Sequence, residues 1–419
     1  MALNNDFIVK SGLVVKSTAT VSSLDSLVTS NIVRTPGKPA LDLNFTRSNT
    51  LDPRIAFRRA SGATYVASDG TIKSVDVNVP RFNYDIATGQ PLGFWTEIAR
   101  TNLWPTSTSP ITNYATGNIC TVTNDIKTLE VASPVYKHIR YPGQTGDNNT
   151  GYIFATMNSG TVYTVSSYVW IPSVTTVTSV SISCDGGDTT FFPADLTKTN
   201  QWQRVWTTCT SASTTFRAFC MRPNGMTDGG YLYSSCWQLE AGTYPTSYIP
   251  TYGANASRVA DYAAINGQSF NNFYNPQAST LLIETYLNGP RTSDGSFMAD
   301  LYGGSGNDYI GIQYVQGSGA YSAVNYVVKN GLGAGTSNVA SNTSFNAVHK
   351  EALSFDTTSI ITYYDGVPVT HNPYTGVPIV YQLTLGGRGD TNFKGTGGIR
   401  RLVYYPQKLS AAQLQALTT

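Results

Sequence analysis

Charge is scarce in this chain of 419 residues, since only 12% of the residues are Asp, Glu, Lys or Arg. An ordinary soluble domain contains roughly 25%. The 27 basic and 25 acidic side chains leave a net charge of +2, and the densest basic cluster is Arg54, Arg58 and Arg59. Proteins that bind nucleic acids carry a basic stripe, so the composition argues against polyanion binding. A wholly disordered chain is excluded as well, because hydrophobic residues reach 41%.

Glutamate is the rarest of the common charged residues. The chain has 20 Asp but only five Glu, namely Glu97, Glu130, Glu240, Glu284 and Glu351. Glu favours helices, whereas Asp favours turns and helix caps. The imbalance therefore predicts a fold of strands and loops.

Metal-binding patterns and export signals are also missing. The five cysteines (Cys120, Cys184, Cys209, Cys220 and Cys236) contain no CxxC pair, and the three histidines are dispersed, so we predict no metal site and no cofactor. Wide spacing and an odd count favour reduced, buried thiols, with a disulfide as the alternative. The N-terminus has no basic patch followed by an apolar run, and nowhere do 18 apolar residues occur together, so we expect neither a secretory signal nor a membrane span.

What the chain does contain is many short runs rich in Val, Ile, Thr, Tyr and Phe, bounded by Gly, Asn, Asp or Pro. Examples are residues 161–172, 176–184, 279–287, 320–328 and 360–370. This pattern predicts an all-β protein of β-sandwich domains. Asp365-Gly366 lies between two apolar runs and predicts a tight hairpin turn. A capping box of Ser410 and Gln413 predicts one C-terminal helix, with Leu409, Leu414 and Leu417 buried against the preceding strand.

Composition divides the chain into four parts. Residues 1–40 form an N-terminal arm and a linker, 41–102 a small β-rich module, and 103–254 and 255–419 two β-sandwich domains. In the arm, FIVKSGLVVKSTATV repeats a β-prone unit, and Val21, Leu24 and Val28 follow at heptad spacing. The arm is interpreted either as an oligomeric shaft or docking segment, or as a partly ordered tail.

A resemblance to known proteins rests on three segments. FRRASGATYVASDGTIKSVDVNVPRFNYD followed by GQPLGFWTEIARTNL resembles a module of bacteriophage tail-fibre and related virion proteins. WQLEAGTYPTSYIPTYGANASRVAD looks like the closing strand of a carbohydrate-binding-module-like jelly roll. TLLIETYL, ITYYDGVPV and GIRRLVYYPQKLSAAQLQAL are similar to laminin-G-like or concanavalin-A-like lectin domains.

The resemblance implies a phage virion structural protein, a tail fibre or receptor-binding protein that contacts host surface glycans. It also implies a homotrimer whose N-terminal arm joins other virion proteins, and assembly into the virion in the host cytoplasm. The alternatives are a purely structural head decoration, collar or baseplate element, and a depolymerase of surface polysaccharide. Laminin-G-like domains sometimes bind calcium, but no clustered Asp loop supports that ion here.

Catalytic patterns are not found. A glycosidase needs two carboxylates flanking the scissile bond, yet the sequence has no E-x-D-x-x-E run and Glu284 stands alone in its strand. No G-x-S-x-G elbow occurs either. We therefore expect no enzyme and no catalytic residue. We interpret Arg388-Gly389-Asp390 as a turn.

Binding of a sugar requires less: an aromatic ring to stack on the sugar and a few polar groups for its hydroxyls. Trp202, Arg204 and Trp206 alternate, so on one strand they share a face. Tyr231, Tyr233 and Trp237 share parity on another strand. Trp206, Arg204 and Tyr231 are therefore the predicted ligand-binding residues, with a core or interface role as the alternative. The adjacent pairs Tyr363-Tyr364 and Tyr404-Tyr405 each predict one ring facing in and one facing out.

Overall fold

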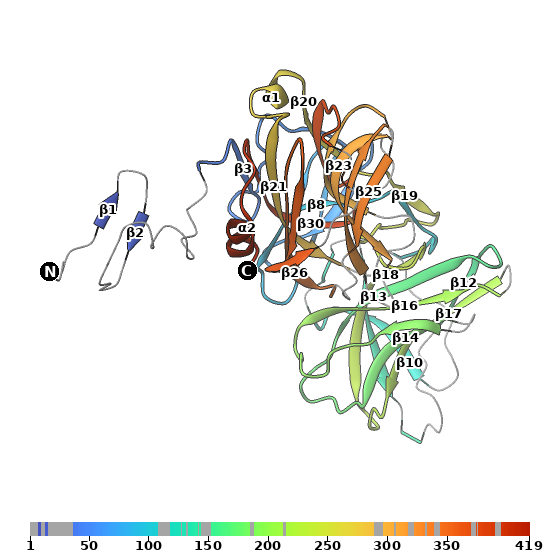
Figure 1. The fold of residues 1–419 in the computed structure, drawn as a ribbon. Helices are drawn as coiled ribbons and strands as arrows, with labels where there is room; N and C mark the ends of the chain where they lie inside the picture. The colour runs from blue at the N-terminus through green and yellow to red at the C-terminus, as the bar shows by residue number, and fades with distance from the viewer. Residues whose placement is uncertain are drawn as a thin grey trace.

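The protein is nearly all-β, as the sequence predicts. The computed structural model describes residues 7–9, 13–15, 37–107, 118–126, 128–130, 133–140, 142–143, 152–184, 188–212, 215–288, 296–305, 307–316, 322–331, 333–338, 344–369, 374, 376–389 and 395–419. Two sandwiches of antiparallel sheets contain most of these residues (Figure 1). The described residues include two helices, α1 (Gly267–Asn271) and α2 (Ala411–Thr418), and neither has the length and hydropathy needed to cross a membrane.

Two large sheets form what we term the C-terminal sandwich. One sheet has the spatial order β25 (Gly333–Asn338), β24 (Ser322–Asn330), β23 (Asp308–Gln316), β22 (Ser296–Tyr302), β29 (Gln382–Leu385), β20 (Tyr262–Asn266) and β4 (Ala56–Arg58). The other has the order β28 (Val367–Val369), β27 (Ile360–Tyr364), β26 (Ala347–Asp356), β21 (Ala278–Leu287), β30 (Gly397–Tyr405), β8 (Pro91–Thr96) and β7 (Arg81–Tyr84), and β3 (Leu41–Asn44) also pairs with β30. Apolar side chains from both sheets fill the core between them.

The strands β3, β4, β7 and β8 correct the predicted domain division. Residues 41–102 were expected to form a small module of their own, but these four strands belong to the sheets of the C-terminal sandwich. Leu43 pairs with Leu402, and Phe94 pairs with Ile399. The blue strands β3 and β8 accordingly lie beside red β30 in Figure 1. Pairing between strands so distant in the sequence leaves no local sequence pattern, so composition alone could not reveal it.

Residues 118–241 form the second sandwich, here called the middle sandwich (green in Figure 1). Its larger sheet has the order β10 (Asn118–Thr123), β11 (Val135–Arg140), β18 (Tyr231–Ala241), β13 (Val162–Trp170), β16 (Trp202–Thr210) and β15 (Asp188–Phe192). Its smaller sheet has the order β12 (Tyr152–Thr156), β17 (Thr215–Asn224) and β14 (Ser179–Cys184). A separate apolar core, which includes Trp237 and Val205, lies in this sandwich.

Three two-stranded elements complete the described fold. β5 (Ala63–Val66) pairs with β6 (Ile72–Val75). β9 (Arg100–Asn102) pairs with β19 (Ala256–Arg258), so the chain segments that enter and leave the middle sandwich lie side by side. In the arm, β1 (Phe7–Val9) pairs with β2 (Leu13–Val15). The predicted heptad of Val21, Leu24 and Val28 lies outside the described residues.

Local sequence patterns gave correct turns and helix ends. Asp365 and Gly366 both have positive φ, at 44° and 78°, and connect β27 to β28 as a tight hairpin. Ser410 begins α2 with the predicted capping box, in which the Gln413 backbone N–H donates to Ser410 Oγ and the Ser410 N–H donates to Gln413 Oε1. Leu409 and Leu414 are buried, and Leu417 is partly buried against the same cluster. These predictions were confirmed because each depends on neighbouring residues only.

The tyrosine pairs alternate as predicted, but none of the four rings is exposed. Tyr364 and Tyr404 face the main core of the C-terminal sandwich. Tyr363 and Tyr405 face the other side of the sheet, where they belong to the cluster that Leu409 and Leu414 of the α2 region cover. The prediction of an exposed tyrosine surface is therefore wrong for these residues.

A fully buried ionic network lies where the two sandwiches meet. Its members are Arg59, Arg81, Glu97, Arg258 and Asp261, each at most 2% exposed. Glu97 Oε2 lies 2.6 Å from Arg81 Nη1 and 3.0 Å from Arg258 Nη1. Asp261 bridges Arg81 and Arg59, with its Oδ1 3.1 Å from Arg59 Nη1. Because a buried charge without a partner is very costly, the network fixes these chain segments relative to one another.

Hydrogen bonds extend this network to Ser247, in the segment that follows the middle sandwich. The other oxygen of Glu97 accepts from the backbone N–H of Ser247 at 2.7 Å, and Arg81 Nη1 also donates to Ser247 Oγ at 3.1 Å. Burial alone would raise the pKa of Glu97, but the charges of Arg258 and Arg81 outweigh that effect and lower the pKa to about 2. Glu97 is therefore ionised throughout the physiological pH range.

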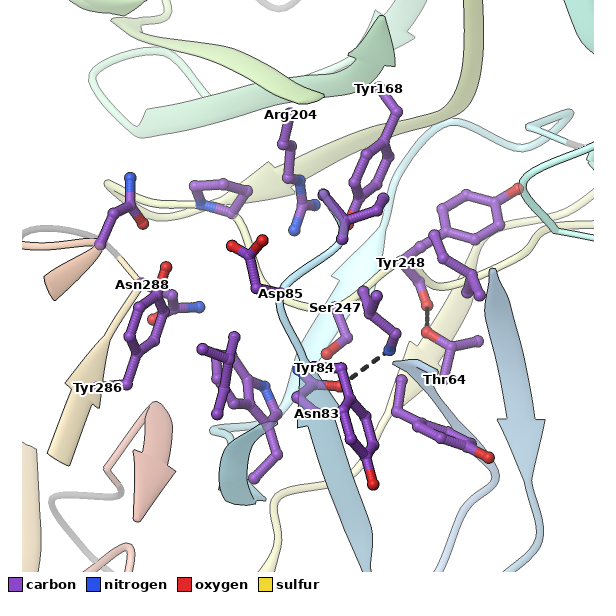
Figure 2. A pocket seen from close by; sticks show the side chains of 18 of the residues that line it. Thr64, Asn83, Tyr84, Asp85, Tyr168, Arg204, Ser247, Tyr248, Tyr286 and Asn288 are labelled. Atoms are coloured by element: carbon purple, nitrogen blue, oxygen red, sulfur yellow. Dashed lines mark hydrogen bonds between the residues drawn. The ribbon is translucent and has the colours of Figure 1, made fainter. Parts of the chain in front are cut away.

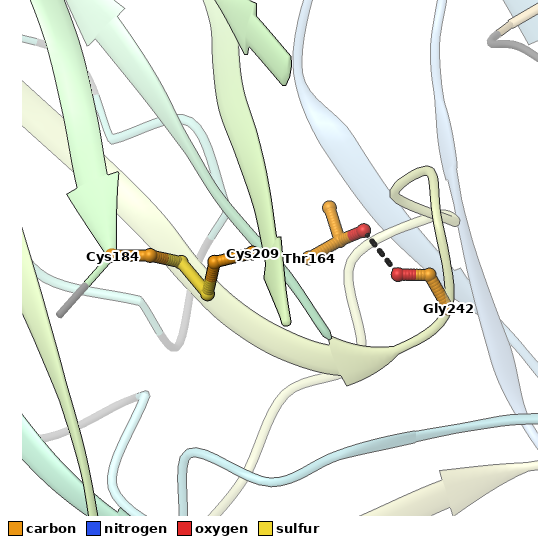
Figure 3. The surroundings of a disulfide bond; sticks show 4 residues. All are labelled: Thr164, Cys184, Cys209 and Gly242. Atoms are coloured by element: carbon orange, nitrogen blue, oxygen red, sulfur yellow. Dashed lines mark hydrogen bonds between the residues drawn. A yellow bond between two sulfur atoms is a disulfide. The ribbon is translucent and has the colours of Figure 1, made fainter. Parts of the chain in front are cut away.

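A disulfide crosses the middle sandwich between its two sheets. Cys184 on β14 bonds to Cys209 on β16, with Cα atoms 6.0 Å apart (Figure 3). Cys236, in contrast, is a buried free thiol, and burial raises its pKa to about 12. The expectation of reduced thiols throughout is thus corrected for this pair. Spacing in the sequence could not show it, because the two strands meet only through the packing of one sheet on the other.

Loss of the disulfide should destabilise the middle sandwich. The bond closes a loop with a sequence separation of 25 residues, for which chain entropy predicts about 3 kcal/mol of stabilisation. We expect dithiothreitol to lower the Tm of the wild type, and the Cys184→Ala/Cys209→Ala variant to have a reduced Tm that the reductant does not change. Equal wild-type melting curves with and without reductant would contradict the bond.

Acid should weaken the ionic network in a defined pH range. The pKa of Glu97 is about 2 in the folded protein and 4.5 ordinarily, so the unfolded chain binds the proton more readily. The stability that Glu97 contributes is present above pH 4.5 and is lost as the pH falls towards 2. We expect chemical unfolding at pH 7, 5, 4 and 3 to show this decline.

The Glu97→Gln variant should lose that pH dependence and be less stable at pH 7 by about 3–5 kcal/mol, because Arg81 and Arg258 lose their shared counter-charge. Glu284→Gln, which alters a partly buried pair with Arg400, serves as the control and should retain the acid-dependent decline. An unchanged pH profile in Glu97→Gln would refute the assignment.

Candidate functional site

The structure places Trp202, Arg204 and Trp206 on one face of β16, as predicted. Their strand neighbour Val205 points into the core of the middle sandwich instead. The shared face is less exposed to solvent than expected, since Trp202 and Trp206 are 7% and 5% exposed. Trp202 packs in a cluster with Ile72 of the β5–β6 hairpin. The reason is the fold of residues 41–102, which covers this side of the sheet.

Tyr231 lies apart from the other two predicted ligand-binding residues. Ser166 of β13 pairs with Trp206 on one side and with Gln238 of β18 on the other. Gln238 lies seven positions along β18 from Tyr231, so Tyr231 is far from Trp206 in the sheet. Tyr231 instead packs edge-to-face against Tyr233, with Lys137 Nζ 4.4 Å from its ring centre. The structure therefore brings Arg204 and Trp206 together but not Tyr231.

Tyr231 and Tyr233 share a face, as predicted, but Trp237 does not. Tyr231 and Tyr233 pack in the cluster outside the core of the middle sandwich, whereas Trp237 is in that core. Cys236 between them has φ of 55°, and the pairing of β18 with β13 shifts register nearby. Such an irregularity inserts one residue and reverses the faces that follow.

Arg204 and Trp206 line a cleft where the two sandwiches and residues 64–95 meet (Figure 2). The first wall is the middle sandwich, with Tyr168 beside Arg204. The second is the end of β21, with Tyr286 and Asn288, and the lining also includes residues 83–86, Trp95 and Ser247. The cleft volume is about 160 Å³, room for roughly five water molecules, which suits a ring-sized ligand.

Two opposite charges face each other across this cleft. Figure 2 shows the Asp85 carboxylate pointing towards the Arg204 guanidinium from the opposite wall. Asp85 is held in its turn because its Oδ1 accepts hydrogen bonds from the N–H groups of Ala87 and Thr88, at 3.1 and 2.8 Å. Arg204 Nη2 donates to Ser166 Oγ at 3.0 Å, and its guanidinium carbon lies 5.3 Å from the Tyr168 ring centre. Both charges are thus anchored without pairing to each other.

Three polar atoms on the lining residues are buried and have no hydrogen-bond partner. They are Trp95 Nε1, Arg204 Nε and Asn288 Oδ1. A buried polar group without a partner costs about 1–3 kcal/mol, so native proteins rarely retain several at one place unless function requires them. Their gathering at one cleft marks it as the candidate site.

Aromatic rings supply the apolar part of the site. The ring centres of Trp95 and Tyr286 lie 6.3 Å apart, and Tyr286 is partly exposed at the cleft. Burial raises the pKa of the Tyr286 hydroxyl, and the negative charge of Asp85 raises it further, so this hydroxyl stays protonated. Tyr286 is therefore better placed than Trp206 to offer a ring face to a ligand.

Trp206 has a contact that favours the interface role considered from the sequence. Its ring stacks on Phe192, with centres 3.8 Å apart, and Phe192 packs edge-to-face on Phe345 at 5.0 Å. Phe345 in turn packs against the core of the C-terminal sandwich. One face of Trp206 thus serves the junction between the sandwiches.

Acid–base and metal chemistry find little support in the described residues. Asp85 is the only carboxylate among the residues that line the cleft, and two carboxylates are needed for glycoside hydrolysis. Within the described ranges, no group of three or more His, Cys, Asp or Glu residues could hold a metal ion. Glu284 forms an ion pair with Arg400. The arrangement can bind and orient a ligand by hydrogen bonds and ring contacts.

The Arg388-Gly389-Asp390 triplet does not display its arginine. Arg388 is 9% exposed, and its guanidinium carbon lies 5.2 Å from the Tyr309 ring centre. A Cβ atom on Gly389 would meet the Tyr302 ring at 2.3 Å, so this position accepts only glycine. Asp390 lies outside the described residues. The geometry of Arg388 and Gly389 agrees with a packing role.

Sequence reasoning missed Asp85, Trp95, Tyr286 and Asn288. Asp85 and Trp95 come from the segment that was expected to be a separate module, and Tyr286 and Asn288 from the strand β21 and its end. Each residue occurs in an ordinary turn or strand pattern. The one local signal was the turn of DIATGQ, which predicts a fixed Asp but does not show what faces it.

Comparisons with known proteins find only distant structural similarity. No protein-family model matches the chain, and no curated protein is found similar to it. The carbohydrate-binding module CBM40 of the Ruminococcus gnavus IT-sialidase, solved with α2,3-sialyllactose, has 18% identity over 35% of this chain and 84% of its own, with a TM-score of 0.30. The Streptococcus pneumoniae sialidase NanB has 14% identity over 37% of this chain and 26% of its own, with a TM-score of 0.31.

A pentraxin from Limulus polyphemus has 9% identity over 35% of this chain and 73% of its own, with a TM-score of 0.28. Similarities of this size indicate nothing about ligand or activity. The candidate site therefore depends on its own geometry.

Proposed function

We propose that this protein is a glycan-binding protein whose ligand site is the cleft between its two sandwiches. The gathering of Trp95 Nε1, Arg204 Nε and Asn288 Oδ1 without partners beside the Tyr286 ring carries this proposal. A sugar offers hydroxyls for the polar groups and a C–H face for the ring. The proposed protein binds its ligand without cleaving it, because Asp85 has no second carboxylate opposite it in the lining.

We further propose that the protein is a bacteriophage virion component, a tail fibre or receptor-binding protein that contacts host surface glycans. The support is the resemblance of residues 55–102 to a module of phage tail-fibre proteins. The interface contact of Trp206 through Phe192 to Phe345 favours the alternative, a purely structural virion element in which the aromatic residues only join domains. The two functions predict different results for the cleft variants.

The cleft should be tested by binding of the purified full-length chain to an array of bacterial and host-type glycans and to host cells. Trp95→Phe and Asn288→Ala each remove one unpaired group, so we expect each to weaken binding by about two- to tenfold, the equivalent of one hydrogen bond. Folding should remain intact, since neither group has a protein partner to lose.

Tyr231→Ala is the matched control, because Tyr231 was predicted from the sequence but lies outside the cleft. It should leave binding unchanged. Loss of binding in Tyr231→Ala but not in the cleft variants would show that the ligand binds at Tyr231 and not in the cleft. Absence of binding to any glycan or host cell would favour the structural alternative. Release of oligosaccharides from host polysaccharide would show that the protein cleaves as well.

A homotrimer assembled through residues 1–40 is part of the same proposal. Light scattering of the full-length chain at micromolar concentration should give three times the 45.2 kDa of one chain. Removal of residues 1–40 should lower the assembly state, because the two sandwiches have their own cores. A full-length monomer would contradict the trimer.

A further inference from the structure

We propose that the cleft accepts a charge-neutral pyranose with free ring hydroxyls and discriminates against acidic sugars. The inference rests on the proposed glycan-binding function and specifies the class of sugar. It follows from two features of the lining, namely its balance of hydrogen-bond donors and acceptors and its balance of charge.

The unpaired groups of the cleft include both donors and an acceptor. Trp95 Nε1 and Arg204 Nε carry hydrogens to donate, whereas Asn288 Oδ1 can only accept. A hydroxyl group donates one hydrogen bond and accepts others, so neighbouring hydroxyls on one ring can satisfy all three atoms. An ionised carboxylate only accepts, so a carboxylate placed against Asn288 Oδ1 would leave that oxygen unsatisfied, whereas a hydroxyl there can donate to it.

The charges of the lining cancel. Arg204 and Asp85 are the only Arg, Lys, Asp or Glu residues that line the cleft. A carboxylate drawn to Arg204 also approaches Asp85, which faces Arg204 in Figure 2, and like charges at short range repel each other. A neutral ring meets no such repulsion, and hydrogen bonds to charged partners are stronger than those between neutral groups.

Asp85 is suited to act as an acceptor for a ligand. Its Oδ1 already accepts from the Ala87 and Thr88 N–H groups and from Thr88 Oγ1, so the turn fixes the orientation of the carboxylate. The second oxygen, Oδ2, takes part in none of these three hydrogen bonds. Tyr286 supplies the neighbouring ring, and its hydroxyl lies near enough to Asp85 for that negative charge to raise the pKa of the hydroxyl.

Binding requires a small adjustment of side chains. Trp95 Nε1, Arg204 Nε and Asn288 Oδ1 are each covered by neighbouring atoms, so a ligand reaches them only after side-chain rotation. Rotamer changes at a binding surface are common and leave the backbone in place. The buried network beneath the cleft, through Arg81 to Thr64 and Ser247, holds that backbone.

The test compares matched sugars that differ only in charge. Methyl glycosides of glucose, galactose and mannose are titrated against the full-length protein at pH 7 beside the corresponding methyl uronides, in which a carboxylate replaces the C6 hydroxymethyl group. We expect the neutral member of the bound pair to bind at least about tenfold more tightly. In Asp85→Asn this ratio should fall severalfold, because the amide retains the Oδ1 acceptor of the turn but removes the negative charge.

Asp69→Asn is the matched control, since Asp69 also accepts from a turn N–H, that of Thr71, but does not line the cleft. It should leave the ratio as in the wild type. A uronide that binds as tightly as its neutral partner, or array binding confined to acidic glycans, overturns the inference while the glycan-binding function stands. Absence of binding to any sugar and any glycan on the array overturns the proposed function itself.

Discussion

Five charged side chains, each at most 2% exposed, hold two distant stretches of this chain in one arrangement. Arg59, Arg81 and Glu97 come from the first 100 residues, and Arg258 and Asp261 follow the middle sandwich. Removing charges from water is costly, so each of them is stable only while its partners are present. Two sandwiches joined only by apolar contacts could shift relative to each other by the width of a side chain. Paired guanidinium and carboxylate groups instead define one relative position. The network therefore specifies the junction more than it stabilises the fold.

The cleft depends directly on this junction. Arg81 Nη1 donates to the Thr64 carbonyl and to Ser247 Oγ, and both residues line the cleft. Its strand neighbour Asn83 accepts from the Val66 N–H at 2.9 Å, which ties the β5–β6 hairpin to β7. The Trp95 and Asn288 side chains, whose unpaired atoms are covered by neighbouring atoms, thus line a cleft whose walls these contacts fix. A rigid support beneath a polar site is what allows unpaired groups to persist.

Local patterns in the sequence predicted the strands, the Asp365-Gly366 turn and the capped C-terminal helix, because each depends on residues that are neighbours in the chain. They also placed Arg204 and Trp206 on one face. They failed where distant segments meet: the strands of residues 41–102 join β20 and β30, and the bulge at Cys236 reverses the faces of β18. The cleft combines Asp85, Arg204 and Asn288 from three such segments, so no spacing in the sequence could reveal it.

The pairing of β3 and β8 with β30 also determines when the protein can finish folding. Pro91 and Arg400, which share a hydrogen bond, are 309 residues apart, and Asp42 and Arg401 are 359 apart. During synthesis the early strands leave the ribosome long before their partner exists. Both sheets of the middle sandwich come from one continuous stretch of the chain. The middle sandwich can therefore fold before the C-terminal sandwich, whose strands β3 and β8 need β30. A chain that stops short of residue 397 would consequently lack the shared strand and expose the unpaired edges of β3 and β8 to other chains.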